Sequence, residues 1–122
     1  MIIHKKCDIF ESGADIICHQ VNCRGVMGSG VAKQIKDRYP FVFDEYKKWC
    51  VERTPEALLG CTQFVRLVPS RAEVKDGEFY GVINMFGQLS YGYDGKCYTD
   101  YEALARCFKT VNEFCRDFFA FA

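Results

Sequence analysis

One segment, residues 14–36, constrains the fold of this chain more than any other. Within residues 15–21, a nearly continuous apolar stretch is formed by Ile16, Ile17, Cys18 and Val21, a pattern that is typical of a strand covered on both faces. Gly25, Gly28 and Gly30 follow, and then a segment in which apolar residues recur at helical spacing. A buried strand that leads through a glycine-rich turn into a helix indicates an α/β fold.

The rest of the chain continues this alternation of strands and helices. Strands are predicted at residues 2–5, 15–21, 61–68 and 79–86. Helices are predicted at residues 30–39, 40–53 and 99–117. The last helix opens at Thr99, where Glu102 three residues later completes a capping box. Because 122 residues without a linker or repeat make one domain, we expect a single layered α/β domain with a mixed, mostly parallel sheet flanked by helices.

The charge balance and the hydropathy of the chain exclude several function classes. Its 16 Lys and Arg residues match 16 Asp and Glu residues, so general nucleic-acid binding, which needs an excess of positive charge on one face, is not expected. No apolar run approaches the roughly 20 residues that cross a bilayer, and the amino terminus lacks the features of a signal peptide. We therefore expect a cytoplasmic protein without membrane association.

The eight cysteines are interpreted as free thiols rather than as disulfides or metal ligands. Five of them lie in apolar periodic segments, namely Cys7, Cys18, Cys61, Cys107 and Cys115. The sequence contains no CxxC pair, and the group nearest to a metal box is Cys18, His19 and Cys23. No metal and no cofactor are expected.

The glycine-rich turn after the second strand is the candidate ligand loop. In an open α/β sheet, ligands bind beyond the carboxyl ends of the strands. Gly28, Ser29 and Gly30 immediately precede a helix, so backbone amides there can approach a phosphate, and the helix dipole favours its charge. The alternative is a simple turn in which Ser29 caps the helix. The pattern alone leaves both interpretations open.

Five segments resemble, in order, the motifs of the macrodomain family, which binds ADP-ribose. They are CDIF, ADIICHQVN, GVMGSGVA, INMFGQ and TDYEAL, and the resemblance runs from Cys7 to Phe121. It implies that Asp8 accepts a hydrogen bond from the adenine amino group and that Asn22 contacts the distal ribose. Cys7 stands where the family usually has glycine, and His19 replaces the family's first asparagine. The ligand-binding residues that the resemblance implies are Asp8, Ile9, Asn22, Gly25, Val26, Met27, Gly28, Ser29, Gly30 and Val31.

The HxxN form of this motif resembles the branch that contains ADP-ribose 1''-phosphate phosphatases and enzymes that remove ADP-ribose from proteins or DNA. The resemblance implies ADP-ribose or ADP-ribose 1''-phosphate as ligand, with His19 and Asn22 as catalytic residues. With a reference pKa near 6.5, His19 is a candidate general acid or base. The alternative is a histidine that is hydrogen-bonded for structural reasons.

Two departures from the family pattern weaken the expectation of catalysis. Members that attack the ribose with a lysine place it four residues after the strand asparagine, and counting from Asn84 this chain has Gln88 there. Glutamine cannot form a Schiff base. The family's final strand, second glycine loop and closing helix are also expected to be missing, because residues 118–122 predict only the beginning of that strand. An uncovered sheet edge predicts self-association.

Three function hypotheses therefore remain at this stage. The first is an ADP-ribose-binding protein that hydrolyses its ligand at the distal ribose. The second is a non-catalytic ADP-ribose binder, or an interaction module whose sheet a partner chain completes. The third is a generic nucleotide-binding α/β domain, which would not discriminate ADP-ribose from ATP or NAD.

Overall fold

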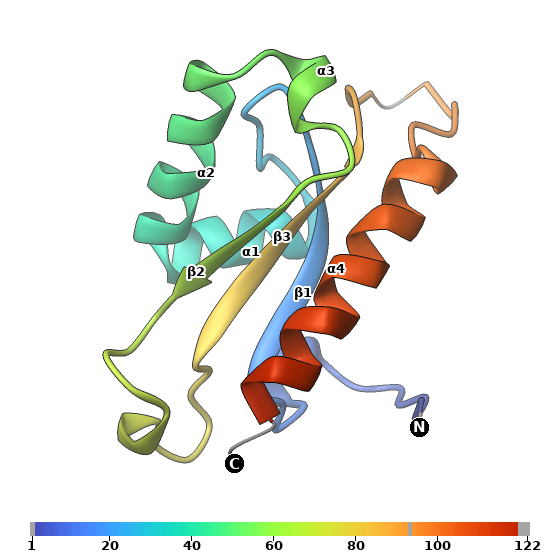
Figure 1. Cartoon of the computed structure of the whole chain (residues 1–122). Coiled ribbons are helices and arrows are strands. Elements are labelled where there is room, and N and C mark those ends of the chain that lie inside the picture. The colour runs from blue at the N-terminus through green and yellow to red at the C-terminus, as the bar shows by residue number, and fades with distance from the viewer. Residues whose placement is uncertain (1, 93, 120–122) are drawn as a thin grey trace.

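A three-stranded sheet lies between two layers of helices in the computed structural model, which describes residues 2–92 and 94–119. The strands are β1 (Ile16–Asn22), β2 (Thr62–Arg66) and β3 (Gly81–Gln88), in the order β1-β3-β2 (Figure 1). The pair β1–β3 is parallel and the pair β2–β3 is antiparallel. The mixed sheet flanked by helices is as the sequence predicts.

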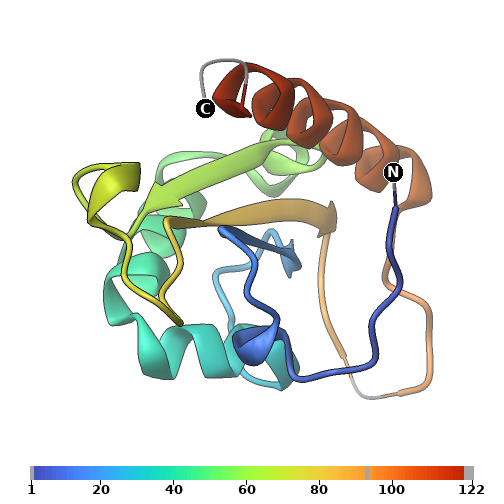
Figure 2. The same cartoon turned by 90° about the horizontal axis from the view of Figure 1, so that it is seen from below.

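The helices divide between the two faces of the sheet (Figure 2). They are α1 (Gly30–Arg38), α2 (Pro40–Glu52), α3 (Pro55–Leu58) and α4 (Tyr101–Phe119), with short 3-10 turns η1 (Ile9–Glu11) and η2 (Arg71–Glu73). Figure 2 shows α4 on one side of the sheet and α1 with α2 on the other, which makes a three-layer α/β/α arrangement. Within the described residues, no helix combines the length and the apolarity that crossing a bilayer requires.

Alternating side chains of the strands fill both layers. On the α1 and α2 side, Ile17, Val65 and Val82 pack with Ile35 and Val42 in one buried cluster. A second cluster on that side joins Val21 and Phe86 to Met27, Tyr46 and Leu58. The opposite face packs on α4, mainly through Ile83, Met85 and Cys107. Burial on both faces explains why β3, the central strand, is almost continuously apolar in sequence.

Three local predictions are wrong, one at the amino terminus and two at the ends of α4. Residues 2–5 form no strand, because Ile2 and Ile3 are 85% and 67% exposed and lie against no other strand. Helix α4 is capped by Asp100, whose carboxylate accepts from the Ala103 amide at 2.9 Å, and not by Thr99. The predicted final strand does not begin at residue 118, because α4 continues through Phe119. The remainder of that prediction, residues 120–122, lies outside the described residues.

The cysteines are free thiols, as predicted. Cys23 and Cys107 are buried, whereas Cys7 is exposed and does not pack as a core residue. Among the described residues, β1 and β2 form the two edges of the sheet. Self-association through a sheet edge stays a prediction.

We predict that Gly81→Ala destabilises the fold by about 1–3 kcal/mol, because it overpacks the contact between β3 and β2. A Cβ atom at Gly81 would lie 2.3 Å from Cε2 of Phe64 and 2.9 Å from the backbone oxygen of Val65, which cannot move freely. Gly28→Ala is the matched control, since a Cβ there meets only Val26, at 3.5 Å. Chemical denaturation measures both variants, and equal stabilities would contradict the prediction.

Candidate functional site

A cavity of about 340 Å³ opens where β1 ends and α1 begins. The strand end, the loop after it and the first turn of α1 form its walls, and residues from the end of β3 and the segment after it close the cavity. Its lining consists of His19, Gln20, Val21, Asn22, Val26, Gly28, Ser29, Val31, Ala32, Gln88 and Tyr91. Among these described residues there is no Asp, Glu, Lys or Arg, so the lining side chains carry no formal charge apart from what His19 can acquire.

Asn22 organises the loop that follows β1. Its Oδ1 accepts from the Arg24 amide at 2.9 Å, and its Nδ2 donates to the Val26 carbonyl at 2.8 Å. The Tyr46 hydroxyl of α2 lies 2.8 Å from the Asn22 backbone oxygen and 2.9 Å from Oδ1, so it donates to both. Burial raises the pKa of Tyr46, which keeps this hydroxyl protonated and able to donate. The buried Tyr46 hydroxyl therefore connects the loop to α2.

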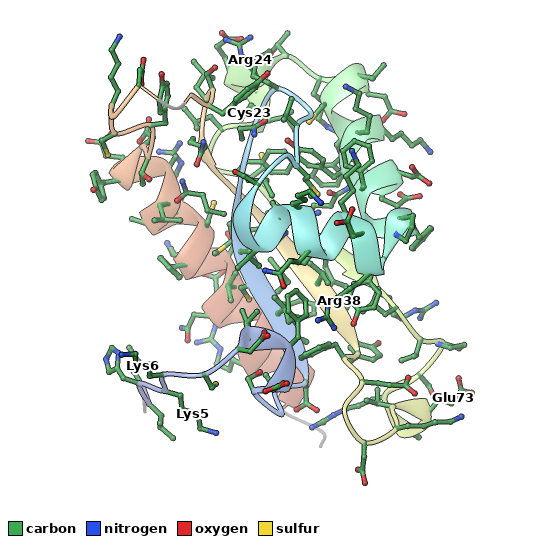
Figure 3. All side chains as sticks on the ribbon, turned by 180° about the vertical axis from the view of Figure 1, so that it is seen from behind. Lys5, Lys6, Cys23, Arg24, Arg38 and Glu73 are labelled. Atoms are coloured by element: carbon green, nitrogen blue, oxygen red, sulfur yellow. The ribbon has the colours of Figure 1, made fainter. Side chains whose placement is uncertain are left out.

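The turn within this loop requires glycine at position 25. Gly25 has a φ of +81°, and a Cβ atom there would lie 2.8 Å from Nζ of Lys47. Lys47 of α2 thus lies directly against the loop backbone. Figure 3 shows Cys23 and Arg24 at the outer end of the loop, beyond α1. The same view places Lys5 and Lys6 on the amino-terminal segment, on the other side of α1 from Arg24.

The amino terminus of α1 faces the cavity without a side-chain cap. Ser29 occupies the N-cap position in an extended conformation, but its hydroxyl makes no capping hydrogen bond. Its backbone oxygen accepts from the Lys33 amide at 3.2 Å. The amides of the first turn have no acceptor within the helix, and the helix dipole places partial positive charge there. Ser29 is therefore not an ordinary helix cap, and this end of α1 is suited to an anion.

His19 belongs to a buried row of polar side chains that crosses all three strands. Its Nε2 lies 2.6 Å from Oδ1 of Asn84 on β3. Asn84 in turn donates from Nδ2 to Oε1 of Gln63 on β2, at 3.0 Å. Gln63 then donates from Nε2 to the backbone oxygen of Glu45 in α2, at 2.9 Å. The row lies on the α1 and α2 side of the sheet.

Burial lowers the pKa of His19 to about 4, against a smaller opposing contribution from the Asn84 hydrogen bond. The reference pKa near 6.5 does not apply to this ring, which is neutral at pH 7. A neutral imidazole has no imidazolium proton to donate, so His19 does not act as a general acid in that way. A catalytic role for His19 and Asn22 in another form stays a prediction.

Comparison with known proteins assigns the family. The sequence model of the family described as "Macro domain" matches residues 18–113, which is most of the chain. The chain belongs to the macrodomain family. The macrodomain of Mycobacterium tuberculosis DarG has a similar structure, with a TM-score of 0.70 and 28% identity over 93% of this chain and 70% of that one.

Two curated relatives carry names that describe an activity. A DNA ADP-ribosyl glycohydrolase of Mycobacterium tuberculosis is 42% identical over 50 residues, which is 41% of this chain and 14% of the relative. An ADP-ribose 1''-phosphate phosphatase of Meyerozyma guilliermondii is 35% identical over 66 residues, which is 50% of this chain and 38% of the relative. This macrodomain therefore spans well under half the length of either curated relative.

The macrodomain brings together about half of the residues that the sequence implied. The residues that line the cavity as expected are His19, Asn22, Val26, Gly28, Ser29 and Val31. Five others do not line it, namely Asp8, Ile9, Gly25, Met27 and Gly30. Met27 is buried in the core, and Asp8 caps η1 by accepting from the Phe10 amide at 2.9 Å. Contact between Asp8 and an adenine stays a prediction.

The cavity also contains Gln20, Val21 and Ala32, which sequence reasoning did not assign to it, together with Gln88, which occupies the family's lysine position, and Tyr91, which follows the end of β3. Gln20 donates to Gln88 and, at 3.1 Å, to the Thr99 hydroxyl, while Gln88 donates to the Ser90 carbonyl at 2.7 Å. These bonds hold the segment that carries Tyr91. Their position in the sequence could have indicated this role, because Gln20 and Gln88 lie toward the carboxyl ends of neighbouring parallel strands.

We predict that His19 makes stability depend on pH between about 4 and 6.5. The unfolded chain protonates this histidine below its reference pKa near 6.5, whereas the folded chain does so only near pH 4, where its pKa lies. The unfolded state then binds more protons in this window, so the free energy of unfolding falls by about 3 kcal/mol as the pH drops through it. His19→Gln removes this contribution.

Denaturant titrations of both proteins at pH 7 and pH 4.5 measure the difference. The carboxylates contribute equally in the two proteins, so they cancel in the comparison. An identical decline in stability for the parent and for His19→Gln would show that the buried imidazole is not the group responsible.

Proposed function

We propose that this macrodomain binds ADP-ribose or an ADP-ribose derivative in the cavity at the carboxyl end of β1. One observation carries the proposal, namely an uncapped helix amino terminus that faces a cavity whose described lining contains no carboxylate. Free backbone amides and a helix dipole are suited to a diphosphate, and a carboxylate would repel it. The name of the phosphatase relative, which includes ADP-ribose, supports the same ligand.

The orientation we propose places the diphosphate at Gly28 and Ser29 and the distal ribose beside His19. The adenine then extends past Val31 toward Asp8 and Ile9. This direction is chosen because Ile9 and Val31 pack against the same buried cluster. The loop is held by Asn22 and Tyr46 and not by the ligand, so little ordering is required on binding.

Hydrolysis at the distal ribose is the second candidate function, and the names of both curated relatives favour it. Among the described lining residues, none is a lysine or a carboxylate, and Gln88 lines the cavity instead. No lining side chain therefore supplies an amine that attacks the ribose. We propose hydrolysis of ADP-ribose 1''-phosphate, rather than a lysine-dependent glycohydrolase reaction, as the activity to assay.

Titration calorimetry with ADP-ribose is the direct test of binding. The expected result is saturable binding that ATP does not reproduce at equal concentration, because the site reads the distal ribose as well as the phosphates. Asp8→Ala tests the adenine end of the orientation and is expected to weaken binding. A folded sample that gives no heat with ADP-ribose would contradict the proposed function.

We predict that Ser29→Asp weakens ligand binding more than Ser29→Asn does, whereas the two substitutions have similar effects on stability. Both side chains cap a helix well, and each is expected to stabilise α1 by about 0.5–1 kcal/mol. Only Asp adds a negative charge where the diphosphate is proposed to bind, so it should weaken ADP-ribose binding at least ten-fold relative to Asn.

Thermal unfolding and ADP-ribose titration of the two variants separate these effects. The comparison holds the size and the capping ability of the side chain nearly constant. Equal affinity of the two variants for ADP-ribose would mean that the anion does not bind at the amino terminus of α1.

We predict that ADP-ribose 1''-phosphate, and not a glycosidic ADP-ribose conjugate, is the substrate that turns over. Phosphate release from the first and ADP-ribose release from the second are measured side by side. Heat-inactivated protein is the control. Release of ADP-ribose from the conjugate at the faster rate would contradict the assignment.

A further inference from the structure

We propose that Gln63 and Asn84 are positioning residues which hold His19 as a hydrogen-bond acceptor for a hydroxyl group of the bound ligand. The inference rests on the proposed function and deepens it, because it names the group on the ligand that the buried end of the cavity reads. Two observations support it: the directions of the hydrogen bonds that link His19, Asn84 and Gln63, and the absence of a partner for Nδ1 of His19 among the described residues.

The direction of every hydrogen bond in the row follows from its last acceptor. The Glu45 backbone oxygen can only accept, so the amide group of Gln63 must present Nε2 to it and Oε1 to Asn84. Asn84 must then present Nδ2 to Gln63 and Oδ1 to His19. An oxygen at that place requires Nε2 of His19 to carry the proton.

A neutral imidazole with its proton on Nε2 has a lone pair on Nδ1. In the described part of the chain, Nδ1 of His19 is buried and has no hydrogen-bond partner. His19 is only 7% exposed and is one of the residues that line the cavity. Leaving a buried acceptor unsatisfied is costly, so a donor that reaches Nδ1 from the adjoining cavity is strongly favoured.

The donor is a small neutral hydroxyl group. Nδ1 is closed to solvent, so a donor reaches it only when neighbouring groups shift, and a hydroxyl group requires a much smaller shift than a bulky guanidinium. A hydroxyl can come from a trapped water or from the ligand. In the proposed orientation the ligand hydroxyls nearest to His19 are those of the distal ribose, which ADP-ribose has and ADP lacks. A site built to bond a hydroxyl discriminates strongly against an analogue without it.

The test is a ¹⁵N NMR spectrum of the His19 side chain in the intact protein at pH 7, because the protonated and unprotonated ring nitrogens resonate far apart. The expected spectrum has Nε2 protonated and Nδ1 not. Adding ADP-ribose should shift the Nδ1 resonance, and adding ADP at saturating concentration should not. A proton on Nδ1 in the free protein would overturn the inference.

Two further outcomes of the same titration would also overturn it. If ADP-ribose binds by calorimetry but leaves Nδ1 unchanged, the proposed function stands and this inference fails. If ADP shifts Nδ1 as ADP-ribose does, the donor is not the distal ribose but a trapped water or another group. If ADP-ribose does not bind the folded protein, the proposed function fails and the inference fails with it.

Gln63→Met tests the positioning role, because it conserves side-chain size but removes the group that fixes how Asn84 is turned. The amide of Asn84 is then free to rotate, so the spectrum should show both protonation forms of His19. Affinity for ADP-ribose should fall about ten-fold, while affinity for ADP stays unchanged. Retention of the single form and of full affinity would overturn the role of Gln63.

Gln20→Met is the matched control for the spectrum. Gln20 is also an amide near the cavity, but its bonds run to Gln88 and Thr99 and not to His19. The protonation form of His19 should therefore be unchanged in Gln20→Met. If Gln63→Met does not fold, the spectra of the unsubstituted protein with ADP-ribose and ADP decide the inference alone.

Discussion

The buried hydrogen bonds from His19 through Asn84 to Gln63 determine how the three strands of this domain meet. In the register of the sheet, His19 is the direct partner of Asn84 on β3, and Asn84 is the direct partner of Gln63 on β2. A slip of one residue would turn each polar side chain to the other face. Each buried group left unpaired would cost about 1–3 kcal/mol. The row therefore specifies the register, and with it the place where β1 ends and the cavity opens.

Buried hydrogen bonds also fix the conformation of the loop after β1. Asn22 has the residue type of a ligand-binding side chain, yet its oxygen and one amide hydrogen serve the loop and Tyr46. Fixing the loop from inside leaves its backbone amides and the first turn of α1 facing the cavity. An anion site built from fixed backbone dipoles needs no rearrangement when the ligand arrives. The side chains thus shape the site, and the backbone provides the positive potential.

The sequence was sufficient to predict the features that depend on local pattern. The strand, turn and helix over residues 16–38 follow from apolar periodicity and from Gly25, whose φ of +81° few other residues adopt. The wrong predictions concern residues whose role depends on a contact with a residue far away in the sequence. Thr99 has the residue type of a cap, but its hydroxyl accepts from Gln20, 79 residues away, and Asp100 caps the helix instead.

His19 illustrates the same limit for the site. Its lowered pKa follows from burial under α1 and α2, and its bond to Asn84 joins residues 65 positions apart. No local pattern contains either fact, so the sequence alone supported the ordinary pKa of a histidine. The residue type and its place at a strand end were predictable, but its protonation state depends on three strands and one helix.

A cavity without formal charge on its described lining has a consequence for selectivity. Lysine and arginine clusters attract any anion from a distance, whereas helix dipoles act only within about one turn. The amino terminus of α1 therefore favours a phosphate that is already in place, and it contributes little to choosing among phosphorylated ligands. That choice must come from groups that read shape and hydroxyls at either end of the anion. The polar row at His19 stands at one such end, so in the proposed orientation discrimination between nucleotides of similar charge rests on this row and not on the net charge of the chain, which is zero.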